Sequence, residues 1–355
     1  MKIIFTGGGS GGHVIPNIAI INSLEEKHPD IEIVYIGSKT GIEKELIGEQ
    51  GIKYREISTG KLRRYLSKEN IKDFFNVFKG IDDATKIIRE EKPDLVFSKG
   101  GFVAVPVVIG AKKNKVPVVC HESDLTPGLA NKIAKPFAKK VCVTFPETLE
   151  MVGKKGVLCG SPIRSEILEG DKERGLKLLG FNKDKKVLLV IGGSLGSVAL
   201  NNAIKDAIDE LRERYQIIHI CGKGKEDLIV KNKEGVKQFE YVSEELKDYF
   251  ACSDLIISRA GAGSIFELLA LAKPNLLMPL TKKASRGDQI LNAESFEKQG
   301  FSMVIDEDTI TKERLLGALT LLEEKSDDMI SKMKETKLTK ANENIIKVIE
   351  EELNL

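Results

Sequence analysis

The chain has 355 residues, of which 41% are hydrophobic and 30% charged, with a formal net charge of +2. This composition is typical of a folded globular protein rather than a disordered one, and the length favours two domains. No apolar run approaches the ~18–20 residues that cross a bilayer, so we expect no spanning helix and, from the N-terminal residues, no signal peptide.

The first half of the chain alternates short β-branched runs with amphipathic stretches, which predicts a parallel sheet with crossover helices. The expected strands lie near 2–6, 31–36, 94–98, 116–120 and 140–144. The expected helices cover 14–27, 41–50, 68–91, 102–114 and 128–138.

The second half repeats this plan. Its expected strands lie near 187–191, 216–220, 237–241, 254–258 and 275–278. Its expected helices cover 197–214, 243–251, 262–271, 287–299 and 310–324, followed by a charged helical segment, 325–355.

The domain boundary is expected within 160–186, where Gly160-Ser161-Pro162 interrupts the chain. We therefore predict an α/β protein with two Rossmann-like domains, each a doubly wound parallel sheet. The first would cover 1–162 and the second 163–339, with the final helix, roughly 340–355, packing back on the first. Ligands of such sheets bind outside the carboxyl ends of the strands.

Two glycine-rich turns, about 185 residues apart, each follow an apolar strand: KIIFTGGGSGGH from Lys2 to His13 and VLLVIGGSLGS from Val187 to Ser197. A strand that ends in glycines and then opens a helix brings backbone N–H groups and a helix N-terminus to an anion. Two such turns predict two nucleotide-fold domains with a ligand in the cleft between them.

The first turn fits G-x-G-x-x-G at Gly7, Gly9 and Gly12, but no acidic residue follows the second predicted strand to hold a ribose. A dinucleotide site is therefore disfavoured. His13 lies at the mouth of the following helix. A neutral imidazole beside an anion-binding loop suits a general base for an acceptor hydroxyl. The alternative is a histidine that only caps or packs the helix.

The second domain carries further candidates at strand ends. Gly192–Gly196 offers backbone N–H groups and the Ser194 hydroxyl, which suit a pyrophosphate. The turn Ser258–Ser264 opens a helix in which Glu267 could accept both hydroxyls of a ribose. The alternatives are a turn that needs glycine for steric reasons and an acid that stabilises its own helix dipole.

Gln289 and Asn292 lie three residues apart on a predicted helix and so share a face. Two amides together offer both donors and acceptors to sugar hydroxyls. Amides on a helix surface are also commonly only solvated, so this pair by itself is a weak signal.

Polar residues also follow two strands of the first half. His121-Glu122-Ser123-Asp124 follows the strand 116–120, and Lys99-Gly100-Gly101-Phe102 follows 94–98 as a second glycine turn for an acceptor's phosphates. An equally good interpretation is that His121 and Glu122 form a pair with a structural role only. Arg164 lies at the junction of the two halves.

Charge is unevenly divided. Residues 1–160 carry 25 Lys+Arg against 19 Asp+Glu, a net +6, and the remainder has a net −4. The basic half suits a phosphorylated substrate or an anionic membrane surface. No basic stripe interleaved with aromatic residues occurs and Trp is absent, so no nucleic acid is expected. The basic stretch around Phe74–Phe78 is either a membrane-interface segment or an ordinary core-facing helix.

Five widely spaced cysteines form no C-x-x-C pair, which favours reduced core thiols in a cytoplasmic protein. None of the four histidines has a partner at metal-ligand spacing. We therefore expect no metal and no other cofactor.

Taken together, these motifs resemble one family. GGGSGGH, SKGGF, HESDLTPGLANK, GSPIR, GGSLG, SRAGAGSIFE and DQILNA occur in the order and spacing of the MurG family, over nearly the whole chain. The resemblance implies the two-domain GT-B glycosyltransferase fold. It also implies an inverting transfer of GlcNAc from UDP-GlcNAc to the C4 hydroxyl of MurNAc in lipid I, which gives lipid II for peptidoglycan. Members of the family are peripheral at the cytoplasmic face of the cell membrane and need no bound metal.

The resemblance also implies roles for individual residues. His13 is the candidate base, Val242 lies against uracil, and Glu267 holds the ribose diol. The expected donor-binding residues are Ser10, Gly11, Gly12, Arg164, Ser194, Val242, Ala262, Gly263, Ser264, Glu267, Gln289 and Asn292. The candidate acceptor-binding residues are Gly100, Gly101, His121, Glu122 and Asp124.

One motif departs from the family. Its pattern reads His-Glu-Gln-Asn, whereas this chain has Ser123-Asp124 after His-Glu. Aspartate in place of asparagine loses the two N–H donors of the amide and adds a negative charge. The chain could therefore use a different acceptor substrate. Three alternatives therefore stand beside the transferase: a UDP-GlcNAc 2-epimerase-like enzyme, a glycolipid synthase of the same fold, and a non-catalytic nucleotide-sugar-binding subunit.

Overall fold

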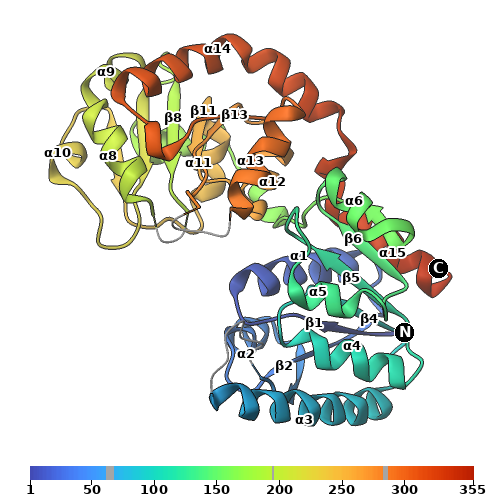
Figure 1. Cartoon of the computed structure of the whole chain (residues 1–355). Helices are drawn as coiled ribbons and strands as arrows, with labels where there is room; N and C mark the ends of the chain where they lie inside the picture. Colours follow the sequence, from blue (N-terminus) through green and yellow to red (C-terminus); the bar gives the residue numbers. More distant parts are fainter. Residues whose placement is uncertain (61–67, 194–195, 283–286) are drawn as a thin grey trace. The chain divides into compact units, whose positions relative to one another are not determined.

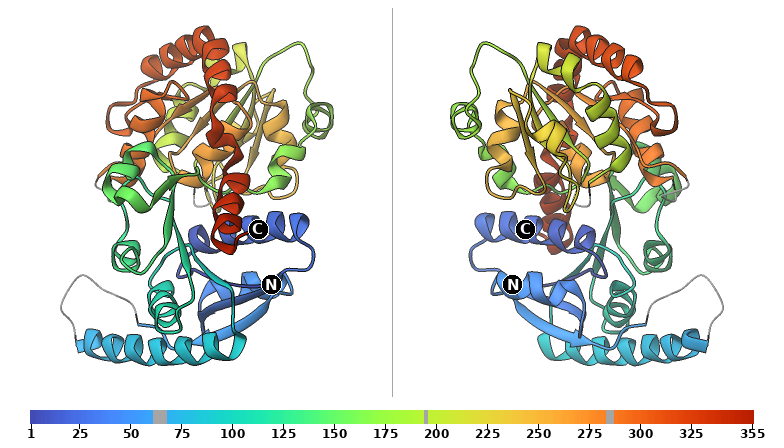
Figure 2. Two further views of the ribbon diagram at one scale, coloured as in Figure 1. Left: turned by 90° about the vertical axis from the view of Figure 1, so that its right-hand side faces the viewer. Right: turned by 90° about the vertical axis from the view of Figure 1, so that its left-hand side faces the viewer.

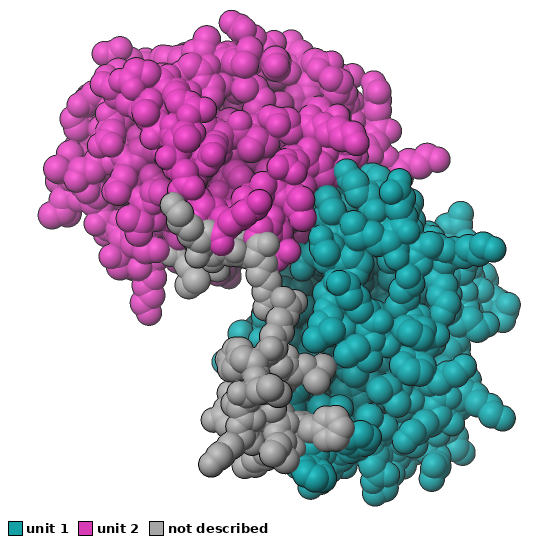
Figure 3. All heavy atoms as spheres, in the orientation of Figure 1, with its two compact units in different colours: residues 1–163, 340–355 teal, residues 164–339 magenta. Residues whose placement is uncertain are grey.

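The computed structural model describes residues 1–60, 68–193, 196–282 and 287–355, with the backbone alone for 68–74. The chain divides into two compact units, coloured separately in Figure 3. Unit 1 comprises 1–163 and 340–355, and unit 2 comprises 164–339. Across the described residues, no helix is both long enough and apolar enough to cross a bilayer.

A parallel sheet forms the centre of unit 1 (Figure 1). In the described residues it has seven strands in the order β3-β2-β1-β4-β5-β6-β7. They are β1 (Lys2–Thr6), β2 (Glu32–Ser38), β3 (Lys53–Ile57), β4 (Leu95–Ser98), β5 (Val118–Glu122), β6 (Lys140–Val143) and β7 (Gly156–Leu158). Because every pairing is parallel, all carboxyl ends lie at one edge of the sheet.

Helices cover both faces of this sheet. They are α1 (Gly11–Lys27), α2 (Ile42–Glu49), α3 (Lys68–Glu91), α4 (Ala104–Lys113), α5 (Leu129–Ala134), α6 (Pro146–Val152) and α15 (Ala341–Leu353). The long helix α3 lies alongside α4 (Figures 1 and 2). Successive strand residues point to opposite sides, so Phe5 and Phe97 pack against α1 and α15 while Ile4 and Val96 pack against α3 and α4. Burial of both faces explains why these strands read as continuous apolar runs.

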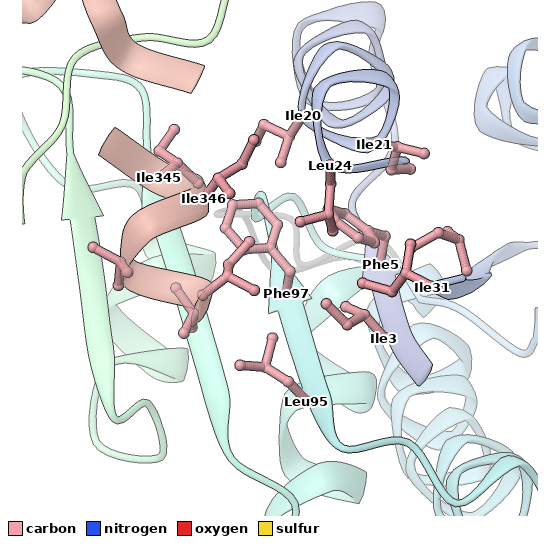
Figure 4. Close-up of a cluster of buried hydrophobic side chains, with 14 of the residues drawn as sticks. Ile3, Phe5, Ile20, Ile21, Leu24, Ile31, Leu95, Phe97, Ile345 and Ile346 are labelled. Carbon is pink, nitrogen blue, oxygen red and sulfur yellow. The ribbon is translucent and has the colours of Figure 1, made fainter. Parts of the chain in front are cut away.

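The C-terminal helix α15 belongs to the core of unit 1. Ile345 and Ile346 lie with Ile20 and Phe97 in one cluster of buried side chains (Figure 4). The side chain of Asn342 also donates to the carbonyl oxygen of Ile163 at 3.1 Å. The last residues of the chain therefore complete a domain that begins at the first.

Unit 2 is built on a second parallel sheet, with the order β10-β9-β8-β11-β12-β13 in the described residues. Its strands are β8 (Val187–Ile191), β9 (Gln216–Ile220), β10 (Val236–Phe239), β11 (Leu255–Ser258), β12 (Asn275–Leu277) and β13 (Met303–Val304). Its helices are α7 (Lys172–Leu179), α8 (Val198–Asp206), α9 (Ile208–Arg214), α10 (Leu228–Lys231), α11 (Leu246–Cys252), α12 (Ala262–Ala270), α13 (Asp288–Lys298) and α14 (Lys312–Glu335). The predicted α/β class with two Rossmann-like parallel sheets is confirmed.

Several elements differ from the predictions. Strand β3 was not expected, because Lys53 and Arg55 interrupt its apolar pattern. In the structure both side chains form ion pairs with the buried Glu91. β7, β13, α6 and α10 were also missed, and the expected helix 197–214 is two helices, α8 and α9. The five cysteines are buried free thiols, as predicted.

Candidate active site

The strand order brings the predicted motifs of unit 1 together. β1 and β4 are neighbours at the centre of the sheet, and the helices that follow them, α1 and α4, pack on opposite faces. The point in a doubly wound sheet where the connecting helices change from one face to the other is the usual ligand-binding position. The glycine loop 7–12 follows β1, and the turn 99–102 follows β4. Both predicted glycine motifs therefore open at the same point of the sheet edge.

The two glycine motifs also touch. Gly101 has a φ of +80° and approaches Gly8 so closely that an added Cβ would lie 2.3 Å from the carbonyl oxygen of Gly8. A Cβ on Gly9, at φ +86°, would lie 2.5 Å from the ring of Phe102. Glycine is needed at both positions because L side chains rarely adopt this backbone conformation and because no room exists for them.

We expect Gly101→Ala to lower kcat/KM by up to about 10²-fold, since its Cβ must displace the backbone of the first glycine loop and a misplaced site loses alignment. Gly153→Ala is the matched control: Gly153 also has a positive φ, +72°, but nothing lies within 4 Å of its Cβ position. Both variants should lose stability from backbone strain, of order 1–3 kcal/mol. Equal activity of the two variants would contradict a role for this contact.

Glu43 of α2 supports the first glycine loop and was missed by the sequence analysis. Its fully buried carboxylate accepts hydrogen bonds from the Gly9 N–H at 3.2 Å, from the Ser38 N–H at 3.1 Å and from the Ser38 hydroxyl. Glu45 and Glu49 lie on the same short helix, so residue type alone does not distinguish Glu43. Only its burial against the loop does.

His13 is the third residue of α1, and its Nδ1 lies 2.9 Å from the Oγ of Ser10, the residue before the helix. Burial and the nearby charge of Lys99 lower the pKa of His13 to about 4, and Glu43 partly opposes them. The imidazole is therefore neutral at pH 7. If Nδ1 carries the proton and donates a hydrogen bond to the Ser10 hydroxyl, then Nε2 keeps a lone pair that can accept a substrate proton. Gly11 and Gly12 form the first turn of the same helix.

The candidate acceptor residues after β5 are tied to the protein itself. His121 is buried, and its Nε2 donates to the carbonyl oxygen of Gly160 at 3.0 Å. Glu122 accepts the N–H of Asp124 at 3.0 Å and the N–H of Gly128 at 2.9 Å. These contacts shape the loop before α5. The direct contact of His121 and Glu122 with an acceptor stays a prediction.

Unit 2 repeats the arrangement at β8 and β11, which are also neighbours. Gly192 and Gly193 follow β8, and the turn that ends at Gly261 follows β11. Gly196, at φ +67°, lies so close to β9 that a Cβ would be 1.9 Å from the carbonyl oxygen of Cys221. The steric alternative therefore holds at Gly196. Ser194, a predicted pyrophosphate ligand, lies outside the described residues.

Arg259 joins the ends of these strands and was not singled out from the sequence. Its buried guanidinium donates to the Met278 carbonyl oxygen at 2.9 Å, to the Ser197 hydroxyl and to the Glu307 carboxylate. The three partners follow β12, β8 and β13. A single cation thus holds the loops at the carboxyl edge of the unit 2 sheet in place.

The helix α12 begins at this edge with an open N-terminus. Its N-cap residue, Gly261, supplies no side-chain hydrogen bond, and no acidic residue lies in the first turn. The N–H groups of Ala262, Gly263 and Ser264 are among the donors that an α-helix leaves without an intrahelical partner, and they suit a phosphate.

Glu267 lies further along α12 and pairs with Arg164. The Arg164 Nη2 and Nε donate to Glu267 Oε1 at 3.1 and 3.3 Å. Burial raises the pKa of Glu267, and the Arg164 charge partly offsets this rise. Two predicted donor-binding residues, 103 positions apart in sequence, are thus brought together within unit 2.

The remaining predicted donor residues differ in accessibility. Gln289 Oε1 accepts the Leu280 N–H at 3.1 Å. Asn292 is only 2% exposed, and its amide donates to the Ala260 carbonyl oxygen at 3.1 Å, directly before the α12 turn. Val242 is also buried. Asn292 therefore supports the turn from inside, and its place with Gln289 at a sugar stays a prediction.

The chain matches two domains of one protein family. The glycosyltransferase family 28 N-terminal domain matches residues 3–143, and the glycosyltransferase family 28 C-terminal domain matches residues 187–349. Together the two domains cover most of the chain.

Curated relatives match over nearly their whole length. A UDP-N-acetylglucosamine–N-acetylmuramyl-(pentapeptide) pyrophosphoryl-undecaprenol N-acetylglucosamine transferase of Clostridium tetani is 58% identical over 350 residues, 98% of this chain and 97% of that protein. A protein of the same name from Clostridium perfringens is 54% identical over 355 residues, 100% and 99% of the two chains.

Solved structures share the fold. MurG of Acinetobacter baumannii superposes with a TM-score of 0.79 at 24% identity and 99% coverage of both chains. A putative UDP-N-acetylglucosamine 2-epimerase of Listeria monocytogenes has a TM-score of 0.73 at 14% identity, covering 99% and 96% of the two chains. At these identities the likeness concerns architecture, which is the GT-B fold. With its full-length relatives and both matched domains, the chain belongs to the MurG family within glycosyltransferase family 28.

Proposed function

We propose that this chain transfers GlcNAc from UDP-GlcNAc to the C4 hydroxyl of MurNAc in lipid I, with inversion, giving lipid II and UDP. The observation that carries the proposal is the 58% identity, along almost the whole chain, to a transferase of that name. The site geometry supports it. Each unit has a glycine-containing turn at the carboxyl edge of its sheet, a type of turn that suits an anion, and each of the two substrates carries a diphosphate.

The residues divide between the two substrates. In unit 1, His13 Nε2 takes the proton of the attacking C4 hydroxyl, and the glycine turns bind the acceptor pyrophosphate. In unit 2, Glu267 accepts the ribose hydroxyls, and the N-terminus of α12 binds the donor phosphates. The bond from the sugar C1 to the phosphate oxygen breaks as the bond from C4–O to C1 forms. The open N–H groups of α12 stabilise the charge that develops on the departing UDP.

The proposal is tested by transfer of labelled GlcNAc to a lipid I analogue, with a reaction lacking acceptor as control. We expect label in the lipid product only when the acceptor is present. Conversion of UDP-GlcNAc to its C2 epimer without acceptor would instead identify an epimerase, whose fold this chain shares. Transfer to diacylglycerol would identify a glycolipid synthase, and UDP-GlcNAc binding without any transfer would identify a binding subunit.

The proposal includes peripheral association with an anionic membrane at the cytoplasmic face of the cell membrane, where the acceptor lipid is held. Two aromatic side chains on α3 support it: Phe75 is 68% exposed and Phe78 is 56% exposed. The neighbouring residues 61–67 and the side chain of Phe74 lie outside the described residues. Comparing transfer to acceptor in anionic and in zwitterionic vesicles tests this part, with faster transfer expected on the anionic surface.

A further inference from the structure

Lys99 is a buried cation in the middle of the unit 1 site. It directly follows β4, and only 1% of the residue is exposed. Its Nζ donates to the Ser123 hydroxyl, and its backbone N–H donates to the Thr6 carbonyl oxygen at 2.9 Å. Moving an ammonium out of water is costly unless nearby groups compensate its charge. The surroundings of this side chain must therefore supply that compensation.

The compensation comes from the loop after β5. Glu122, itself buried, and Asp124 flank Ser123, and their charges favour the protonated form of Lys99. Burial acts in the opposite direction and lowers the pKa of Lys99 to about 8. The side chain is therefore mostly charged at pH 7, and the charges of Glu122 and Asp124 favour that form.

Lys99 also acts on two imidazoles. Burial lowers the pKa of His13 and that of His121, the Lys99 charge lowers both further, and Glu43 is the charged group that opposes it at His13. Its Cβ lies 3.1 Å from the position that a Cβ on Gly7 would take, directly beside the first glycine loop. The strand order explains this placement, because β4 lies between β1, which leads to His13, and β5, which leads to Asp124.

We propose that Lys99 is a positioning residue of the acceptor site, in which its ammonium offsets the Glu122 and Asp124 carboxylates and keeps a positive charge behind the His13 loop. This inference rests on the proposed function for the roles of His13 and the acceptor. It concerns the position at which this chain departs from the His-Glu-Gln-Asn pattern. Aspartate at 124 adds a negative charge that would repel an anionic acceptor, and Lys99 supplies the matching positive charge. The pair is thus compatible with the same diphosphate acceptor.

The first test is a double-mutant cycle of Lys99→Met, Asp124→Asn and the double variant. Lys99→Met should lower the midpoint of thermal unfolding and raise the acceptor KM about tenfold, because two carboxylates lose their counter-charge. The double variant should recover most of both effects. Lys112→Met, an exposed lysine about 13 residues further along the chain, makes the same charge change and should do neither. Additive effects in the double variant would overturn the proposal.

The second test is an NMR titration of the His13 ring in the substrate-free protein, with the signal assigned by the His13→Gln variant. In Lys99→Met the pKa of His13 should rise by about one unit, because the ammonium that disfavours the charged imidazole is gone. An unchanged value would overturn the proposal. Should Lys99→Met fail to fold, the double variant with Asp124→Asn is titrated in its place, and an unchanged pKa of His13 there would overturn the proposal. Neither the titration nor the unfolding cycle needs transfer activity, so failure of the proposed function would be seen separately.

Discussion

His13→Gln is expected to lower kcat for GlcNAc transfer by about 10²- to 10⁴-fold, the range that a general base contributes. The KM values of both substrates should change little, because glutamine keeps a polar side chain of similar size but does not accept a proton at neutral pH. The expectation rests on the position of His13 at the start of α1, with Nδ1 held by Ser10 at 2.9 Å. Steady-state transfer to a lipid I analogue measures it.

The pH dependence of the wild-type enzyme tests the same role. His13 acts only when neutral, so the rate should fall as the pH drops through its pKa. In the free protein that value is lowered to about 4, and the acid limb of kcat/KM, which reports the free enzyme, should lie there. The acid limb of kcat should lie higher, because the bound diphosphates favour the protonated imidazole.

A matched variant separates this role from a general effect of losing a histidine. His28, at the other end of α1, contacts Glu350 at 2.7 Å, so His28→Gln should reduce stability slightly and leave kcat unchanged. The assignment of His13 as base would be withdrawn if His13→Gln kept near-normal kcat. It would also be withdrawn if the acid limb of the pH profile were the same in His13→Gln as in the wild type.

The second large effect is expected at the donor site. Glu267→Gln should raise the Kd for UDP about 10- to 100-fold, since hydrogen bonds to a charged group contribute roughly 1.5–3 kcal/mol. The proposed partners are the two ribose hydroxyls. The wild-type protein should therefore prefer UDP over 2′-deoxy-UDP, and the variant should bind both about equally. Isothermal titration calorimetry measures all four affinities.

Arg164 complicates this test, because its guanidinium donates to the same carboxylate. If Glu267 served only to hold Arg164, the variant would lose affinity for UDP and 2′-deoxy-UDP by the same factor, and the ribose role would be wrong. Glu294→Gln, an exposed acid on α13 of the same unit, is the control for the charge change. It should leave both affinities unchanged.

Much of the fold followed from local patterns. Apolar runs such as Val187–Ile191 predicted strands at the observed residues, because a buried parallel strand needs apolar side chains on both faces. Strand β3 escaped detection because Lys53 and Arg55 are neutralised by Glu91, a partner 38 and 36 residues away. When the partner of a charged residue is distant in sequence, the sequence pattern alone predicts that the residue is exposed to solvent.

The residues of the candidate site also fall into those that local motifs predicted and those that depend on distant partners. The glycine turns, His13 and Glu267 were identifiable because strand, turn and helix follow one another directly in the chain. The roles of Glu43, Lys99 and Arg259 were not, although Lys99 and Arg259 lie within the predicted turns, since each role depends on burial against partners that are distant in sequence.

The α/β class, the two glycine turns and the family follow from the sequence alone. These depend on residue order over short stretches and on motifs that resemble those of the family. Which of the turns lie beside each other depends on long-range strand pairing. The order β3-β2-β1-β4-β5 places the loops of His13, Lys99 and Asp124 side by side, and folding joins Arg164 to Glu267. Long-range pairings of this kind arise from the packing of strands and helices, and no local spacing encodes them.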